Sequence, residues 1–100
     1  MFEPVGDPTE IQPGTMRTYE VAATKVTIAA AAGRLYAFDD ACTHMGCSLA
    51  RGTLEGTTVT CACHGSQFDV TTGAVLRGPA ARPVRSRGVE ISEGRLTVEA

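Results

Sequence analysis

The chain has 100 residues, a length that predicts one domain over residues 1–100 with a modest core. Its formal net charge is −2, and no run of Lys and Arg suggests a surface that binds nucleic acid. The longest apolar run, Ile28 to Ala32, is far shorter than the about 20 residues that cross a bilayer. Glu3, Asp7 and Glu10 lie where a signal peptide would be basic and then apolar, so we expect a soluble cytoplasmic protein without a membrane partner.

The first half of the chain is expected to be mainly strand after an irregular start. Pro4, Pro8 and Pro13 argue against a regular element in residues 1–14. Residues 15–22 alternate in polarity and predict a strand. Residues 25–39 predict a β-hairpin with its turn at Ala32-Gly33, although alanine favours helices, because β-branched residues precede the alanine run and Gly33 interrupts it.

The second half reads as further short strands separated by turns. Residues 48–51 form a connector, and strand residues within 52–62 lead into a second cysteine-containing loop. Residues 67–70 and 74–76 predict two strands around a turn, and residues 82–91 and 95–98 predict a closing hairpin around Glu93-Gly94. This succession predicts an all-β fold, an antiparallel sandwich or partial barrel.

Two short loops hold all four cysteines and both histidines of the chain: residues 42–47 (CTHMGC) and 61–66 (CACHGS). Each loop offers a thiolate and an imidazole within two or three residues, and both are metal ligands. Two interpretations compete, a tetrahedral zinc site and a [2Fe–2S] cluster with two cysteines on one iron and two histidines on the other. Zinc fingers usually pair Cys with Cys and His with His, whereas both loops here are mixed, so the spacing favours the cluster.

The pattern C-x-H, followed after sixteen residues by C-x-x-H, closely resembles that of the Rieske iron–sulfur family over about residues 36–79. The resemblance implies that Cys42 and Cys61 bind one iron of a [2Fe–2S] cluster and that His44 and His64 bind the other. It also implies a Rieske-like sandwich or partial barrel, in which about residues 40–80 form a small cluster-binding subdomain of two loops.

The remaining cysteines, Cys47 and Cys63, carry further information through the same resemblance. High-potential Rieske proteins have this pair and join it in a disulfide, whereas Rieske ferredoxins that feed aromatic-ring oxygenases usually lack it. Such a bridge would stabilise the fold by very roughly 3 kcal/mol. The alternative is a pair of buried free thiols, which suits a reducing cytosol better.

Four further residues bear on the properties of the cluster. Ser66 matches the serine whose hydroxyl hydrogen-bonds a bridging sulfide in the high-potential class, a contact that raises the potential. Phe68 stands where that class commonly has tyrosine, so we expect a potential below the quinol-oxidising extreme. Gly78-Pro79 resembles the proline loop that covers the cluster from a third side; the alternative is a plain surface turn.

The expected function is the transfer of one electron and not catalysis, because both histidines are committed to the metal and no Ser-His-acid set is apparent. The resemblance implies a ferredoxin that takes an electron from a reductase and passes it to an oxygenase, a cytochrome or a similar terminal enzyme. Three alternatives are a Rieske subunit of a larger oxidoreductase of the cytochrome bc or arsenite-oxidase kind, a redox sensor that uses Cys47 and Cys63, and a structural zinc module.

Overall fold

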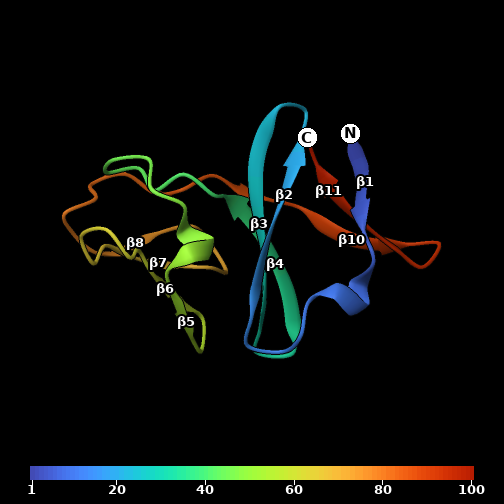
Figure 1. The fold of residues 1–100 in the computed structure, drawn as a ribbon, viewed down its shortest axis with the longest axis horizontal. Helices are drawn as coiled ribbons and strands as arrows, with labels where there is room; N and C mark the ends of the chain where they lie inside the picture. The colour runs from blue at the N-terminus through green and yellow to red at the C-terminus, as the bar shows by residue number, and fades with distance from the viewer.

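The computed structural model describes residues 1–100 and consists of three antiparallel sheets and two short 3-10 helices. Two sheets form a base, and the third lies with the two Cys/His loops at one end of a molecule that measures 40 × 26 × 19 Å (Figure 1). The all-β expectation, with a small subdomain that carries the loops, is confirmed. No helix is long and apolar enough to cross a membrane.

The larger sheet of the base is built from hairpins with two-residue turns. Its strands lie in the order β2 (Met16–Val21), β3 (Thr24–Ala31), β4 (Arg34–Asp39) and β9 (Ser86–Arg87). The turn between β3 and β4 uses Ala32 and Gly33, both with positive φ, which matches the twist of the flanking strands. The alanine run is therefore strand, as its β-branched neighbours and Gly33 predicted.

The second sheet of the base has the order β1 (Phe2–Gly6), β11 (Arg95–Glu99) and β10 (Val89–Ser92). The expectation of an irregular segment over residues 1–14 is wrong, because β1 and the 3-10 helix η1 (Pro8–Glu10) lie there. Pro4 is tolerated because β1 is an edge strand, where a missing N–H costs no ladder hydrogen bond. The closing hairpin around Glu93-Gly94 is confirmed by the pairing of β10 with β11, but its first arm begins only at Val89, because Ser86 and Arg87 pair with β4 in the larger sheet.

The third sheet is a meander of four short strands: β5 (Thr53–Glu55), β6 (Thr58–Thr60), β7 (Gln67–Asp69) and β8 (Val75–Arg77). Residues 52–62 thus make two strands that turn at Gly56, which has φ of 59°. The 3-10 helix η2 (Leu49–Arg51) joins the first loop to this sheet. The second loop connects β6 to β7, so the strand residues deliver Cys61 as expected.

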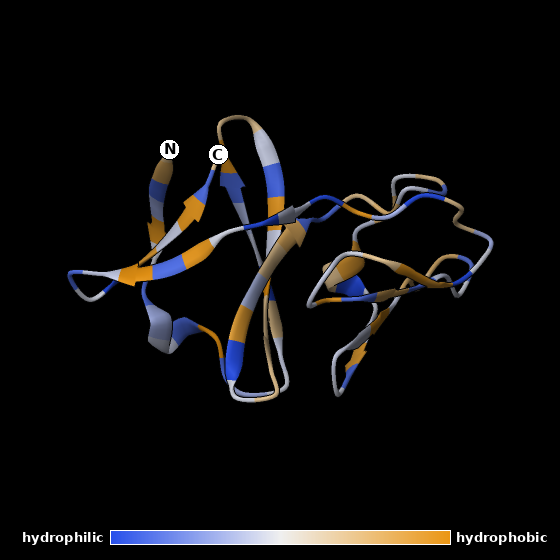
Figure 2. Ribbon diagram, turned by 180° about the vertical axis from the view of Figure 1, so that it is seen from behind, coloured by the Kyte–Doolittle hydropathy of each residue, from blue (hydrophilic) through white to orange (hydrophobic).

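Strand β3 buries side chains on both of its faces. Val26 and Ile28 are fully buried in the core of the base together with Leu96 of β11. Ala29 and Ala31, on the opposite face, belong to a second core that includes residues of β6 and β7 and two of the loop cysteines. Figure 2 shows the alternation of hydrophobic and hydrophilic residues along β10 and β11, which leave one face to solvent.

The N-terminal segment is held by hydrogen bonds that composition did not reveal. Asp7 caps η1 by accepting from the Thr9 backbone N–H at 2.9 Å, and this bond lowers the pKa of the Asp7 carboxyl. Glu10 accepts from the Tyr19 hydroxyl at 2.8 Å, which lowers the pKa of the Glu10 carboxyl. Partial burial, and then the bond to Glu10, raise the pKa of Tyr19 to about 12.

The hydrogen bond between Tyr19 and Glu10 predicts that one of the two tyrosines ionises at a higher pH than usual. In a Tyr36→Phe variant, we expect the remaining phenol, Tyr19, to ionise with a midpoint of about 12, read from its ultraviolet absorbance. Because the unfolded phenol ionises near pH 10, the stability that Tyr19 contributes is complete below pH 10 and is lost as the pH rises towards 12. A midpoint near 10 in the folded protein would contradict the contact, and Glu10→Gln in the same background should lower the midpoint.

Candidate metal centre

The first loop is closed by two backbone hydrogen bonds around its leading cysteine. The Cys42 N–H donates to the Cys47 carbonyl at 2.8 Å, and the Gly46 N–H donates to the Cys42 carbonyl at 2.7 Å. Gly46 has φ of 78°, a left-handed conformation that glycine adopts without steric cost. A β-bridge between Ala41 and Ser48 holds the two ends of the loop together.

The second loop repeats the same frame. The Cys61 N–H donates to the Ser66 carbonyl at 2.8 Å, and the Gly65 N–H, at φ of 78°, donates to the Cys61 carbonyl at 3.1 Å. Strands β6 and β7 close its ends. Both loops therefore begin with a cysteine whose N–H and carbonyl are tied down, which fixes the position from which the thiol projects.

Because the frames match position for position, the histidines do not occupy equivalent places in the two loops. His44 is two residues after its cysteine, where the second loop has Cys63. His64 is three residues after its cysteine, where the first loop has Met45. The difference between C-x-H and C-x-x-H thus reflects which of two neighbouring positions each loop uses for its imidazole.

The structure brings the four candidate ligands together as two pairs with opposite exposure. Cys42 and Cys61 are 2% and 3% exposed and belong to the same hydrophobic core. His44 and His64 are exposed, with ring centroids 5.1 Å apart and planes at 87°. A binuclear group between the loops would have its thiolate side in the core and its imidazole side at the surface.

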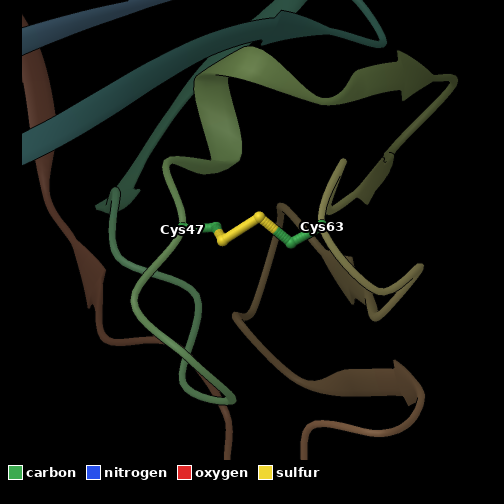
Figure 3. Close-up of a disulfide and its surroundings, with 2 residues drawn as sticks. All are labelled: Cys47 and Cys63. Atoms are coloured by element: carbon green, nitrogen blue, oxygen red, sulfur yellow. A yellow bond between two sulfur atoms is a disulfide. The ribbon is translucent and has the colours of Figure 1, made fainter.

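A disulfide between Cys47 and Cys63 joins the two loops (Figure 3). This confirms the pairing that the family resemblance implied, and the alternative of two free thiols is wrong. The sulfur atoms of Cys47, Cys61 and Cys63 lie within 4.8 Å of one another, yet the two bonded sulfurs cannot act as thiolate ligands. The free thiols of the chain are Cys42 and Cys61 alone, as the expected ligand set requires.

Ser66 ties the second loop to the segment expected to cover the cluster. It is fully buried, and its Oγ accepts from the Ala80 N–H at 3.0 Å. Ala80, directly after Gly78-Pro79, is itself buried in the core that holds Cys42 and Cys61. The Ser66 hydroxyl retains its proton for a further acceptor. Ala80 therefore packs beside the loops, whereas Gly78 and Pro79 themselves are exposed.

Phe68 is fully buried in the third sheet, where it pairs with Val59 of β6 and Val75 of β8. Its ring fills the core beneath the loops and brings no hydroxyl towards the sulfur ligands. Phe68 is therefore a core-packing residue of the sheet that carries the second loop.

Asp40 is a positioning residue that sequence reasoning missed. It is 3% exposed, and its Oδ1 accepts from the Thr27 hydroxyl at 2.5 Å and from the Ala50 N–H at 3.0 Å. Its backbone N–H donates to Lys25 O, and its carbonyl accepts from the Leu49 N–H. One residue thus attaches both flanks of the first loop to β3. The feature of the sequence that could have indicated this role is that Asp40 lies two positions before Cys42, a candidate ligand.

The donor set and its surroundings fit a [2Fe–2S] cluster held by two thiolates and two imidazoles. The thiols are buried in a hydrophobic core, which suits sulfur bonded to iron, and the imidazole rings lie 5.1 Å apart. A model of the Rieske [2Fe-2S] domain matches residues 1–92. The chain belongs to the Rieske [2Fe-2S] domain family. Its cofactor is therefore the [2Fe–2S] cluster, and the zinc interpretation is wrong.

Relatives of this Rieske chain include ferredoxins of oxygenase systems. It is 37% identical to the ferredoxin CarAc of Metapseudomonas resinovorans over 90 residues, 89% of this chain and 84% of the relative. It is 30% identical over 90 residues to the ferredoxin component of the naphthalene 1,2-dioxygenase system of Pseudomonas aeruginosa, 90% of this chain and 86% of that one.

Solved structures agree with the sequence relatives. A chain in the complex of reduced oxygenase and oxidized ferredoxin in carbazole 1,9a-dioxygenase superposes with a TM-score of 0.89 at 35% identity. The match covers 97% of this chain and 91% of that chain. The Rieske chain is accordingly an electron carrier and not itself a catalyst. The cluster, when bound, supplies a reversible one-electron couple. The chain supplies the ligands, a hydrophobic core on the side of the thiols and access to solvent on the side of the imidazoles.

Removal of the disulfide should destabilise the arrangement of the two loops more than it destabilises the two sheets of the base. We expect the Cys47→Ser/Cys63→Ser variant to lose about 3 kcal/mol of stability and to lose its cluster faster on warming, because the two loops are then free to separate. Thermal unfolding and the decay of the visible absorbance measure the two effects. Ser92→Ala, on exposed β10, is the control and should change neither the stability nor the rate of cluster loss. If the double cysteine variant is as stable as this control and keeps its cluster as long, the proposed role of the bridge is wrong.

Proposed function

We propose that Cys42 and Cys61 bind one iron of the cluster and that His44 and His64 bind the other. The observation that carries this proposal is the separation of the four residues into a buried thiol pair and an exposed imidazole pair, with ring centroids 5.1 Å apart. Ser66 would donate its remaining proton to a bridging sulfide, and Gly78-Pro79 would cover the cluster from a third side. Phe68 would leave the sulfur ligands without a hydroxyl donor.

We further propose that residues 1–100 act as one soluble cytoplasmic ferredoxin domain between a reductase and a terminal oxygenase. Support comes from the ferredoxin relatives, whose length the chain nearly matches, and from the similarity to a ferredoxin in complex with an oxygenase. The electron would enter and leave through the imidazoles, because these are the candidate ligands that reach the surface. Neither partner needs to contact the base.

A second candidate function is that of a high-potential Rieske subunit in a larger oxidoreductase. The disulfide favours it, because the resemblance associates this bridge with that class. The buried Phe68 weighs against the upper extreme of potential.

The ligand proposal is tested by single substitutions. We expect Cys42→Ser, Cys61→Ser, His44→Ala and His64→Ala each to abolish the bound cluster, measured as iron and acid-labile sulfide per chain and by electron paramagnetic resonance. The matched control is the Cys47→Ser/Cys63→Ser variant, which should still take up the cluster at low temperature. A full cluster in any of the four single variants would show that the residue is not an essential ligand.

The reduction potential separates the two candidate functions. We expect a midpoint in the lower half of the range of about −150 to +300 mV that Rieske centres span, because Phe68 offers no hydrogen bond to a ligand sulfur. Ser66→Ala should lower the midpoint by several tens of millivolts, since one donor to the reduced cluster is lost. A spectroelectrochemical titration gives both values. A midpoint near the upper limit would favour the subunit function instead.

A further inference from the structure

The chain around the two exposed imidazoles carries positive charge and lacks negative charge. Residues 41–54 and 57–68, which contain both loops, include neither Asp nor Glu. Arg77 and Arg82, on either side of the covering segment, are exposed. Neither takes part in the single ion pair of the structure, which joins Arg87 to Asp39. Their charges are therefore available to a partner.

Backbone contacts place each arginine beside one loop. The Arg82 carbonyl accepts from the Thr43 hydroxyl at 2.6 Å, and Thr43 directly precedes His44. Arg77 ends β8 and pairs with Gln67, the residue that follows Ser66 of the second loop. Both contacts involve the backbone of the arginine or its register in the sheet, so substitution of either side chain leaves them in place.

Two exposed hydrophobic side chains accompany the arginines. Met45 follows His44 and is 66% exposed, and Leu76 precedes Arg77 and is 54% exposed. Arg and Met are enriched in protein–protein interfaces, whose cores are apolar. The flexible thioether of Met45 adapts to more than one partner.

The charge of the whole molecule is divided along its length. Residues 41–85 contain four arginines (Arg51, Arg77, Arg82 and Arg85) and two acidic residues (Glu55 and Asp69). The rest of the chain contains five basic and nine acidic residues. Since the loops lie at one end of a 40 Å axis and most of the base at the other, the molecule is positive at the loops and negative at the far end (Figure 1). Such a field orients an approaching charged partner.

We propose that Met45, Leu76, Arg77 and Arg82, together named the docking surface, bind a redox partner whose contact face is acidic around an apolar centre. The proposal rests on the electron-carrier function, because a partner that reaches His44 and His64 approaches the two loops that these residues belong to or adjoin. The two arginines supply orientation and a fast encounter, and the two apolar side chains supply close contact. The absence of acidic residues in both loops disfavours a basic partner.

Two electron acceptors of opposite charge test the docking surface. The reduced protein is mixed in a stopped-flow instrument with an acidic blue-copper protein or with a basic cytochrome c, each a one-electron acceptor. At low ionic strength we expect the acidic acceptor to react about tenfold faster than the basic one, and we expect added salt to remove the difference. In the Arg77→Glu/Arg82→Glu variant, the rate with the acidic acceptor should fall by about tenfold or more.

The matched control is Arg95→Glu, which makes the same type of charge change at the exposed start of β11, in the base sheet. Its rates should stay within about twofold of those of the parent. The Arg77→Gln/Arg82→Gln variant should lie between the parent and the charge-reversed protein. The visible spectrum of each variant reports whether the cluster is intact.

Binding without electron transfer provides an independent readout. Calorimetry of the oxidised protein with the zinc-substituted, redox-inert form of the acidic acceptor should give a dissociation constant that rises with salt and rises at least about tenfold in the charge-reversed variant. Faster reaction with cytochrome c, equal rates with both acceptors, or an equal loss in Arg95→Glu would overturn the docking surface alone. Transfer to neither acceptor by a protein with an intact, reducible cluster would overturn the carrier function as well.

Discussion

Strand β3 packs side chains on both of its faces. One face contributes to the core of the base and the other to the core beneath the loops, so both halves of the molecule depend on this strand. Val26 and Ile28 face the core of the base, and each fully buried aliphatic side chain stabilises the fold by about 1.5–3 kcal/mol. Ala29 and Ala31 face the core beneath the loops. Their small side chains let that core, with Cys42 and Cys61, lie close against the sheet. A larger residue there would push the loop-bearing subdomain away from the base.

Asp40 joins the first loop to the same strand. Its carboxylate and backbone accept from or donate to groups on β3 and within η2, so the position of Cys42 is set two residues earlier. The second loop is attached differently, through β6 and β7, and the disulfide then fixes one loop relative to the other. The candidate ligands thus gain their arrangement from strands, one buried carboxylate and one covalent bond, which limits reorganisation around the cluster.

The placement of sulfur inside and imidazole outside has a direct consequence for electron transfer. The thiols are shielded by hydrophobic side chains, which keeps water and other thiols from them, whereas the histidines end at the surface. With the ligand set proposed above, electrons have one short route, and the residues that surround His44 and His64 decide which protein can use it. This is why the charge of the neighbouring arginines bears on partner choice although they touch no ligand.

The sequence by itself determined the cofactor class, the candidate ligands and most of the strands, because these depend on local spacing: mixed Cys/His loops, two-residue turns and alternating polarity. It also indicated the disulfide, through resemblance. Spacing did not reveal β1 and η1, whose prolines are tolerated because tertiary pairing puts them at a sheet edge and Asp7 caps the turn. Nor did it reveal the roles of Asp40 or Ala80, or the positions of Arg77 and Arg82 beside the two loops. Those features join residues far apart in the chain, and only the packing of the third sheet against β3 brings them together.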